Sequence, residues 1–394
     1  MMNTGRSAGH DGEGPDSGAM AVARASADAA MHASSAARAS VAGTGRLAAR
    51  FAAERIPGFY RPAGAGMLAS SIGIGTYLGE PDDADDLRYE EALRAAVTGG
   101  LNVIDTAINY RCQRSERVVG RALASLFDDR VARRDEVIVC SKGGYIPLDG
   151  SPPASREDYN ALIEREYFAR GVMRPEDVVG GGHCIAPGYL ADQVARSRAN
   201  LRLDTIDVYY LHNPEQQIPA VGREAFLRRI VRAFEALEAR AEAGDIAAYG
   251  CATWNGLRVA PEARESLSLE ELVGAAREVA GDAHHFQYVQ LPVNLAMSEG
   301  LRAPTQRVAG RERTALEAAS ELGLVVVASA ALMQAALARS LPTAVRDALP
   351  RYDTDAQRAL AFVRGVPGIT TALVGMRGTK HVAENLAIAE TVAR

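Results

Sequence analysis

Lysine is nearly missing from this chain. Of its 44 basic side chains only Lys142 and Lys380 are lysines, and the other 42 are arginines. An ammonium group is compact and changes its pKa readily, whereas a guanidinium stays charged and planar. A lysine kept in so arginine-rich a sequence suggests a site that an arginine could not serve, with an ordinary surface lysine as the alternative. Lys142 directly follows the strand-like run 137–141 and precedes two glycines.

The sequence also lacks the features that would indicate a membrane-spanning protein, a nucleic-acid-binding protein or a metal-binding protein. The chain has no apolar run of about 18 residues or more, so no membrane-spanning helix is expected. A net charge of −5 gives no sign of a nucleic-acid partner or of an anionic membrane surface. The four cysteines are Cys112, Cys140, Cys184 and Cys251. They lack the spacing of metal ligands, so no metal site is predicted. A reducing, cytoplasmic location is expected.

Residues 1–60 are short of aromatic and β-branched side chains. The segment is rich in Ala, Gly, Ser and Arg, and its first aromatic residue is Phe51. Such a composition buries too little apolar surface to offset the entropy lost on ordering. It also lacks the continuous apolar segment of a secretory signal. We therefore expect a disordered tail over 1–60 and one folded domain over 61–394.

Short apolar runs alternate with amphipathic stretches from about residue 68 onward. The apolar runs are continuous, as expected for parallel strands that are buried on both faces. The pattern predicts strands over 71–75, 101–105, 137–141, 206–211, 247–251, 287–291, 324–329 and 371–375. It predicts helices near 87–98, 115–127, 189–201, 227–243, 269–279, 312–321, 355–363 and 379–392. Eight strands, each followed by a helix, favour an α/β fold of the closed (β/α)8 TIM-barrel type.

A doubly wound sheet is the alternative fold. The segment 73–79 after the first strand lacks the third glycine and the helix start of a dinucleotide-binding turn, so the barrel is preferred.

Two connections, 143–188 and 297–311, are longer than a minimal barrel needs. Both follow the carboxyl ends of strands, so each is either a lid over the substrate or a structural loop.

Three successive strands end in ionisable residues, namely Asp105, Lys142 and His212. Each has an ordinary structural explanation when taken singly, such as an ion pair or a cap. Because neighbouring strands lie about 4.8 Å apart, however, the three side chains converge at one mouth of a barrel. We interpret them jointly as a catalytic group.

Tyr110 lies five residues beyond Asp105, and a loop of that length can fold its phenol over the strand ends. A free phenol has a pKa of about 10, which is high for a proton donor at neutral pH. We expect the Lys142 ammonium to lower the pKa of Tyr110, with Asp105 keeping the ammonium charged and oriented.

These residues belong to a longer series of motifs in a fixed order. The series comprises Asp105-Thr106-Ala107-x-x-Tyr110, Ser115-Glu116, Gly120, Ser141-Lys142, Leu203-Asp204-x-x-Asp207-x-x-x-x-His212, Gln290 and Gly375-x-Arg377-x-x-x-His381-x-x-Glu384-Asn385. Over about residues 68–392 the chain resembles the aldo-keto reductase family. The resemblance implies an oxidoreductase in which a nicotinamide coenzyme exchanges hydride with a small-molecule carbonyl or alcohol. It places the catalytic tetrad on Asp105, Tyr110, Lys142 and His212, with Tyr110 as the proton donor and His212 orienting the oxygen.

The resemblance also implies where the coenzyme binds. Gln290 would hold the nicotinamide carboxamide, and the segment 375–385 would hold the adenosine end near a helix start. His381 stands where the family often has an arginine for the 2′-phosphate, but Arg377 and Lys380 supply charge, so NADP(H) is favoured over NAD(H). The implied coenzyme residues are Gly75, Thr76, Asp105, Thr253, Gln290, Ser329, Leu332, Gln334, Gly375, Arg377, Lys380, His381, Glu384 and Asn385.

Trp254 and Tyr77 follow strands at the catalytic end, and we expect them to form a substrate wall with Tyr110 and His212. The chain departs from the family at Ser329, where a tyrosine usually stacks on the nicotinamide. It also has Thr253-Trp254 in place of the usual Ser-Asn. These departures leave open an alternative function as a coenzyme-binding barrel with a sensor or regulatory role and little catalysis. The sequence does not define an oligomeric state.

Overall fold

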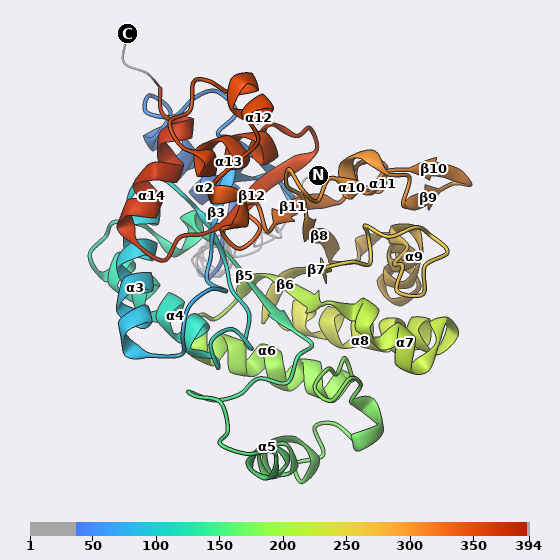
Figure 1. Cartoon of the computed structure of the whole chain (residues 1–394). Coiled ribbons are helices and arrows are strands. Elements are labelled where there is room, and N and C mark those ends of the chain that lie inside the picture. Colours follow the sequence, from blue (N-terminus) through green and yellow to red (C-terminus); the bar gives the residue numbers. More distant parts are fainter. Residues whose placement is uncertain (1–36, 392–394) are drawn as a thin grey trace, which may run out of the picture.

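Eight parallel strands close into a barrel in the computed structural model, which describes residues 37–391 (Figure 1). The strands follow one another around the barrel in chain order, and the last pairs with the first. They are β3 (Ile72–Gly75), β4 (Val103–Asp105), β5 (Ile138–Gly143), β6 (Ile206–His212), β7 (Ile246–Ala252), β8 (Phe286–Pro292), β11 (Val325–Ser329) and β12 (Ile369–Gly375). The predicted TIM barrel and all eight of its strands are confirmed, and no strand end is displaced by more than two residues.

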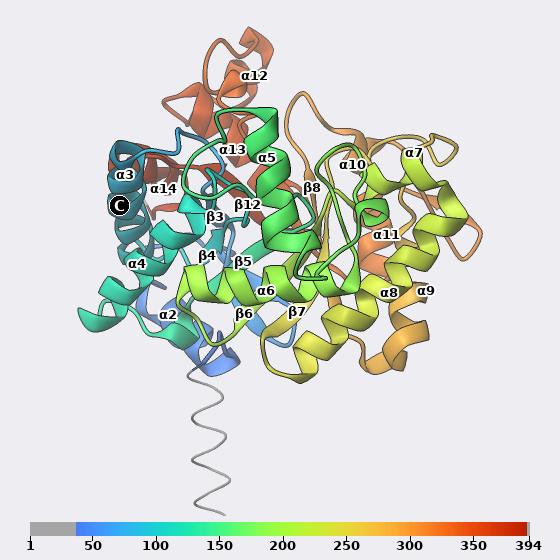
Figure 2. The ribbon, with the colours of Figure 1, turned by 90° about the horizontal axis from the view of Figure 1, so that it is seen from below.

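Helices surround the barrel on its outer side (Figures 1 and 2). They are α3 (Asp83–Thr98), α4 (Arg114–Asp128), α6 (Pro187–Leu201), α8 (Arg223–Glu242), α9 (Leu269–Ala280), α11 (Ala315–Glu321), α13 (Asp355–Gly365) and α14 (Thr379–Leu386). Three predicted starts are wrong: α3 and α8 begin four residues earlier than predicted, and α11 begins three residues later because β10 (Arg311–Arg313) first pairs with β9 (Gln306–Val308). The predicted end at 392 is also wrong. The chain leaves α14 after Leu386, and the Ala389 carbonyl accepts a hydrogen bond from the Ile56 amide at 3.0 Å.

The expected disordered tail needs a correction at its carboxyl end. Residues 1–36 lie outside the described part, but residues 37–60 contain α2 (Val41–Arg50) and the start of a hairpin, β1 (Tyr60–Ala63) with β2 (Met67–Ser70). Ser40 caps α2 by accepting a hydrogen bond from the Gly43 amide, and Leu47 is buried beneath the helix. Arg46 and Arg50 both pair with Glu136. These contacts stabilise a helix that composition alone did not predict.

The 143–188 insertion is closed at its base and carries its helix outside the ring. The Cys184 amide donates to the Gly144 carbonyl at 2.7 Å, and the Ile146 amide donates to the Gly182 carbonyl at 2.8 Å. Beyond this base lies α5 (Arg156–Ile163), which Figure 1 shows outside α6. The shorter elements elsewhere are α7 (Ile218–Val221), α10 (Glu299–Arg302) and α12 (Thr343–Ala348). Among residues 37–391 no helix is long and apolar enough to cross a membrane.

Candidate active site

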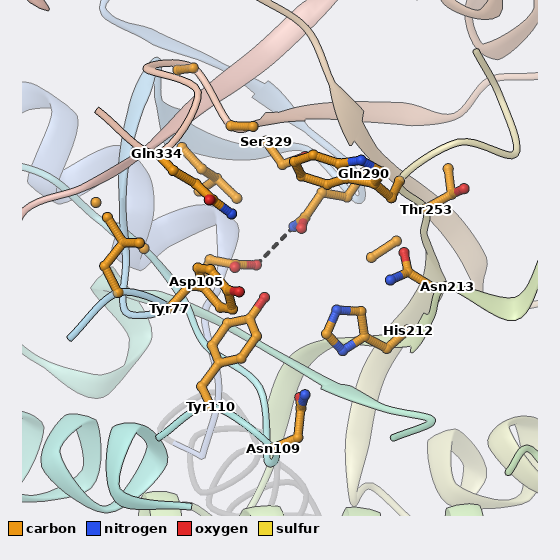
Figure 3. Close-up of a pocket in the computed structure, with 18 of the residues that line it drawn as sticks. Tyr77, Asp105, Asn109, Tyr110, His212, Asn213, Thr253, Gln290, Ser329 and Gln334 are labelled. Carbon is orange, nitrogen blue, oxygen red and sulfur yellow. Dashed lines mark hydrogen bonds between the residues drawn. The ribbon is translucent and has the colours of Figure 1, made fainter. Parts of the chain in front are cut away.

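A cavity of about 580 Å³ opens at the carboxyl ends of the barrel strands. Figure 3 shows the Tyr110 hydroxyl and the His212 ring facing into it. Twelve of the predicted site residues line the wall: Gly75, Tyr77, Asp105, Tyr110, His212, Thr253, Trp254, Gln290, Ser329, Leu332, Gln334 and Gly375. The structure therefore brings most of the predicted set around one space.

Lys142 and Asp105 form a buried ion pair beneath the cavity. The Lys142 Nζ lies 2.5 Å from Asp105 Oδ1 and 2.9 Å from the Thr106 carbonyl oxygen. Burial on its own would lower the pKa of Lys142, but Asp105 and Tyr110 together outweigh burial and raise the pKa above its ordinary value. The other oxygen of Asp105 accepts a hydrogen bond from Gln290 at 2.8 Å (Figure 3). Lys142 is thus held as an ammonium.

Tyr110 lies directly above this pair, with Lys142 Nζ 4.9 Å from the centre of its ring. Lys142 lowers the pKa of Tyr110, as expected, but not by enough to bring it below its ordinary value. Burial raises the pKa of Tyr110 above its ordinary value, while Lys142 opposes the rise and the Asp105 charge offsets part of the effect of Lys142. The neutral phenol is therefore the form present at neutral pH, which suits a proton donor.

The three residues after Tyr110 form a left-handed turn that no sequence pattern indicated. Arg111, Cys112 and Gln113 have φ angles of 47°, 54° and 67°. For residues other than glycine this conformation costs about 1–2 kcal/mol each. Contacts on both sides hold the turn. The Arg111 guanidinium lies 2.6 Å from Asp86, and the side-chain amide of Gln113 donates a hydrogen bond to the Leu148 carbonyl at 3.0 Å.

His212 ends β6 with its ring edge-on to that of Tyr110, at a centroid distance of 5.8 Å. Burial, with the charge of Lys142 adding to it, holds the pKa of His212 well below its usual range, so the ring is neutral at neutral pH. Its Nδ1 has no hydrogen-bond partner within residues 37–391. The His212 carbonyl oxygen lies 2.7 Å from Nε2 of His183, at the end of the insertion.

The sequence did not predict seven polar residues of the cavity wall: Asn109, Tyr145, Asn213, Glu215, Gln216, Asn255 and Glu265. Asn109, Asn213 and Asn255 each directly flank a predicted residue, so the segments around the strand ends already pointed to them. Tyr145 is the one residue of 143–188 that lines the cavity, so the insertion contributes to the wall without covering the site as a lid. No residue of 297–311 lines it.

The remaining predicted coenzyme residues lie away from the cavity wall. Thr76 bonds to the Asp105 carbonyl through its amide, at 3.1 Å. Glu384 accepts a hydrogen bond from Thr354 at 2.6 Å, and Asn385 is buried. Arg377, Lys380 and His381 are exposed around the start of α14, beyond Gly375. Arg377 also lies 3.2 Å from Asp85.

Comparison with known proteins decides the family. The model of the Aldo/keto reductase family matches residues 71–278, more than half of the chain. The chain belongs to the aldo/keto reductase family. Aldo-keto reductase YhdN of Bacillus subtilis is 28% identical over 163 residues, which is 40% of this chain and 38% of that protein. Aldo-keto reductase AMT2 of Alternaria alternata is 30% identical over 173 residues, 41% and 42% of the two chains. The matches therefore span less than half of these relatives.

Solved aldo-keto reductases share the fold of this chain. An aldo/keto reductase from Klebsiella pneumoniae, solved with NADP and acetate, has a TM-score of 0.57 and 23% identity and covers 85% of this chain and 91% of its own. The holo form of AKR11C1 from Bacillus halodurans has a TM-score of 0.56 and 19% identity, with coverage of 85% and 92%.

Proposed function

We propose that this aldo/keto reductase interconverts a small-molecule carbonyl and its alcohol with NADP(H), using Tyr110 as the general acid and base. The observation that carries the proposal is the buried Asp105–Lys142 pair beneath a neutral Tyr110, with neutral His212 beside it on the same cavity. Proton transfer by a positioned side chain of this kind contributes about 10²–10⁴-fold to a rate.

The residues present fit a nicotinamide coenzyme. The cavity extends from Tyr110 and His212 to Gly375, and Gln290 and Thr253 on its wall carry groups that can bond a carboxamide. The exposed charges of Arg377 and Lys380 near the start of α14 suit a phosphate, which favours NADP(H) over NAD(H). The NADP complex of the Klebsiella protein supports the same choice. The bound coenzyme supplies or accepts the hydride.

Residues of the chain then protonate and orient the carbonyl oxygen. In reduction, Tyr110 donates its proton to that oxygen, and the Lys142 ammonium stabilises the phenolate that remains. Asp105 keeps Lys142 charged and in place. The neutral ring of His212 donates an N–H to the same oxygen and orients it. In alcohol oxidation each of these transfers runs in reverse.

The test is NADPH consumption with a panel of aldehydes and ketones, in the wild type and in Tyr110→Phe. We expect the wild type to turn over and the variant to lose at least about 100-fold in kcat. A variant that keeps the full rate would refute Tyr110 as the proton donor. Tight NADPH binding in a fluorescence titration, with no turnover of any carbonyl by the wild type, would favour a coenzyme-binding sensor instead.

A further inference from the structure

His212 lacks the hydrogen bond that commonly orients a catalytic imidazole. In such rings one nitrogen bonds a carbonyl or carboxylate oxygen, and this bond fixes the direction of the other nitrogen. The Nδ1 of His212 is enclosed and has no partner within residues 37–391. Its ring is contacted instead by two phenol rings edge to face, that of Tyr110 at a centroid distance of 5.8 Å and that of Tyr145 at 4.9 Å. The orientation of the His212 ring in the cavity (Figure 3) therefore depends on packing.

Tyr145 is itself held at three points. The side-chain amides of Asn213, at 2.8 Å, and of Gln216 both donate hydrogen bonds to its hydroxyl. Its backbone carbonyl accepts a hydrogen bond from the Tyr189 hydroxyl at 2.8 Å. Its ring meets the ring of His183 at a centroid distance of 5.1 Å and an interplanar angle of 83°. These contacts fix the Tyr145 ring nearly perpendicular to the catalytic imidazole, at 89°.

His183 ties the far end of the 143–188 insertion to the backbone of His212. An arginine only donates hydrogen bonds, so the 2.6 Å contact with Arg229 identifies the oxygen of the Gln217 amide. The NH2 group of Gln217 therefore donates to Nδ1 of His183 at 2.8 Å. Burial lowers the pKa of His183 to about 4, so the ring is neutral and its one proton lies on Nε2. That nitrogen donates to the His212 carbonyl at 2.7 Å.

Gly144 leaves room for this hydrogen bond. A Cβ atom at Gly144 would lie 2.7 Å from the His212 carbonyl oxygen and 3.0 Å from Nε2 of His183. A larger residue would therefore push the two groups apart. Because Tyr145 and His183 also form a backbone bridge, the start and the end of the insertion hold the carboxyl end of β6 together.

We propose that the base of the 143–188 insertion orients the ring of His212 toward the carbonyl oxygen of the substrate, with Tyr145 and His183 as positioning residues. This inference rests on the proposed function. Edge-to-face packing of rings is directional, so Tyr145 restricts the His212 ring as the missing hydrogen bond would. His183 holds the backbone from which that ring projects. A misplacement of about 1 Å can cost about 100-fold in rate, so these contacts set how much His212 contributes.

A double-mutant cycle tests the proposal, with kcat measured at saturating NADPH and with the aldehyde that the wild type reduces fastest. Tyr145→Leu, which removes the ring, should lower kcat by at least about 10-fold. In a His212→Ala background the same substitution should change kcat by less than about 2-fold, because no imidazole is left to orient. Tyr110 still donates its proton in that background, so the residual rate is measured at high enzyme concentration. Tyr145→Phe keeps the ring and should recover most of the kcat lost in Tyr145→Leu.

Tyr159→Leu is the matched control, because Tyr159 lies in the same insertion and its hydroxyl bonds the Gly181 carbonyl at 2.9 Å, away from the cavity. It should keep the wild-type kcat. Fluorescence titration should give Tyr145→Leu the wild-type Kd for NADPH, since its loss lies in the orientation of His212. Thermal melting shows which variants are folded. If Tyr145→Leu is not, His183→Leu, which removes the donor to the His212 carbonyl, goes through the same cycle and decides the outcome.

Equal losses in the two backgrounds, or no loss from Tyr145→Leu when His212 is present, overturn the positioning role and leave the proposed function standing. A wild type that reduces no carbonyl refutes the proposed function and this inference with it. A His212→Ala variant with the wild-type rate removes His212 from the mechanism, and the inference falls with that role.

Discussion

The ammonium nitrogen of Lys142 lies 2.5 Å from a carboxylate oxygen of Asp105, and only 1% and 6% of the two side chains are exposed. The same nitrogen bonds the Thr106 carbonyl and approaches the ring of Tyr110. A compact ammonium can serve all three partners in this buried space. A guanidinium is larger and planar and would need a different arrangement of them.

Lys142→Arg is therefore expected to be nearly inactive although its charge is kept. We predict a loss of at least about 100-fold in kcat, because the phenolate of Tyr110 loses its stabilising neighbour. Steady-state kinetics with saturating NADPH measure the loss, and circular dichroism shows whether the fold is retained. A folded Lys142→Arg variant with the wild-type rate would contradict the role given to Lys142.

The pH profile of reduction should be flat through neutrality. Because burial raises the pKa of Tyr110 above its ordinary value, the proton donor is present at neutral pH and is lost only above about pH 10. Because the pKa of His212 is lowered, we also expect no transition in the reduction rate near pH 6.5. The measurement is kcat/KM for carbonyl reduction across this range. A decline centred near pH 7 would show that Tyr110 titrates far lower than its surroundings indicate.

His183 should make the fold less stable in acid. Burial lowers its pKa to about 4, from about 6.5 in the unfolded chain, so between these values the unfolded state binds the proton more readily. The stability contributed by neutral His183 is complete above pH 6.5 and is lost as the pH falls toward 4. We predict a loss of about 2 kcal/mol between pH 7 and pH 5 from this group. Urea unfolding at both pH values should show a smaller loss for His183→Gln than for the wild type.

Arg111 should matter to both stability and activity. Its side chain is almost fully buried, pairs with Asp86 and stacks on Tyr89 with a separation of 5.3 Å. We predict that Arg111→Ala costs about 3 kcal/mol of unfolding free energy and lowers kcat, because the strained turn that places Tyr110 loses its anchor. Arg88→Ala, which removes a largely exposed arginine, should change stability by less than about 0.5 kcal/mol. Equal effects of the two substitutions would contradict the anchoring role.

The choice of coenzyme can be tested at the start of α14. Replacing Arg377 and Lys380 together with serine should weaken NADPH binding by about 10-fold and change NADH binding much less, since the 2′-phosphate is present in NADPH alone. Fluorescence titration with each coenzyme gives both Kd values. An equal loss of affinity for NADPH and NADH would show that Arg377 and Lys380 bind a part of the coenzyme other than the 2′-phosphate.

The barrel could be predicted because each strand is a continuous apolar run, and the strand ends placed Asp105, Lys142 and His212 at one mouth. The residues of the cavity wall that lie on loops were harder to predict from the sequence. Tyr145 reaches the cavity because His183, nearly forty residues later, fixes the base of the insertion to β6, and a sequence does not show that contact. The direction of the Tyr110 pKa shift also required the structure, because it depends on how burial compares with the field of an ion pair. The helix α2 is stabilised by Glu136, which is distant in the chain.

The burial of Lys142 also fixes how the protein reacts with reagents that attack amines. The sequence offers such a reagent two lysine side chains besides the amino terminus, and Lys142 is inaccessible inside the barrel. Lys380 is exposed at the start of α14, near Gly375 on the cavity wall. Among the lysines, amine chemistry would thus attach a fluorophore at Lys380 alone, with no engineered cysteine and with Lys142 untouched.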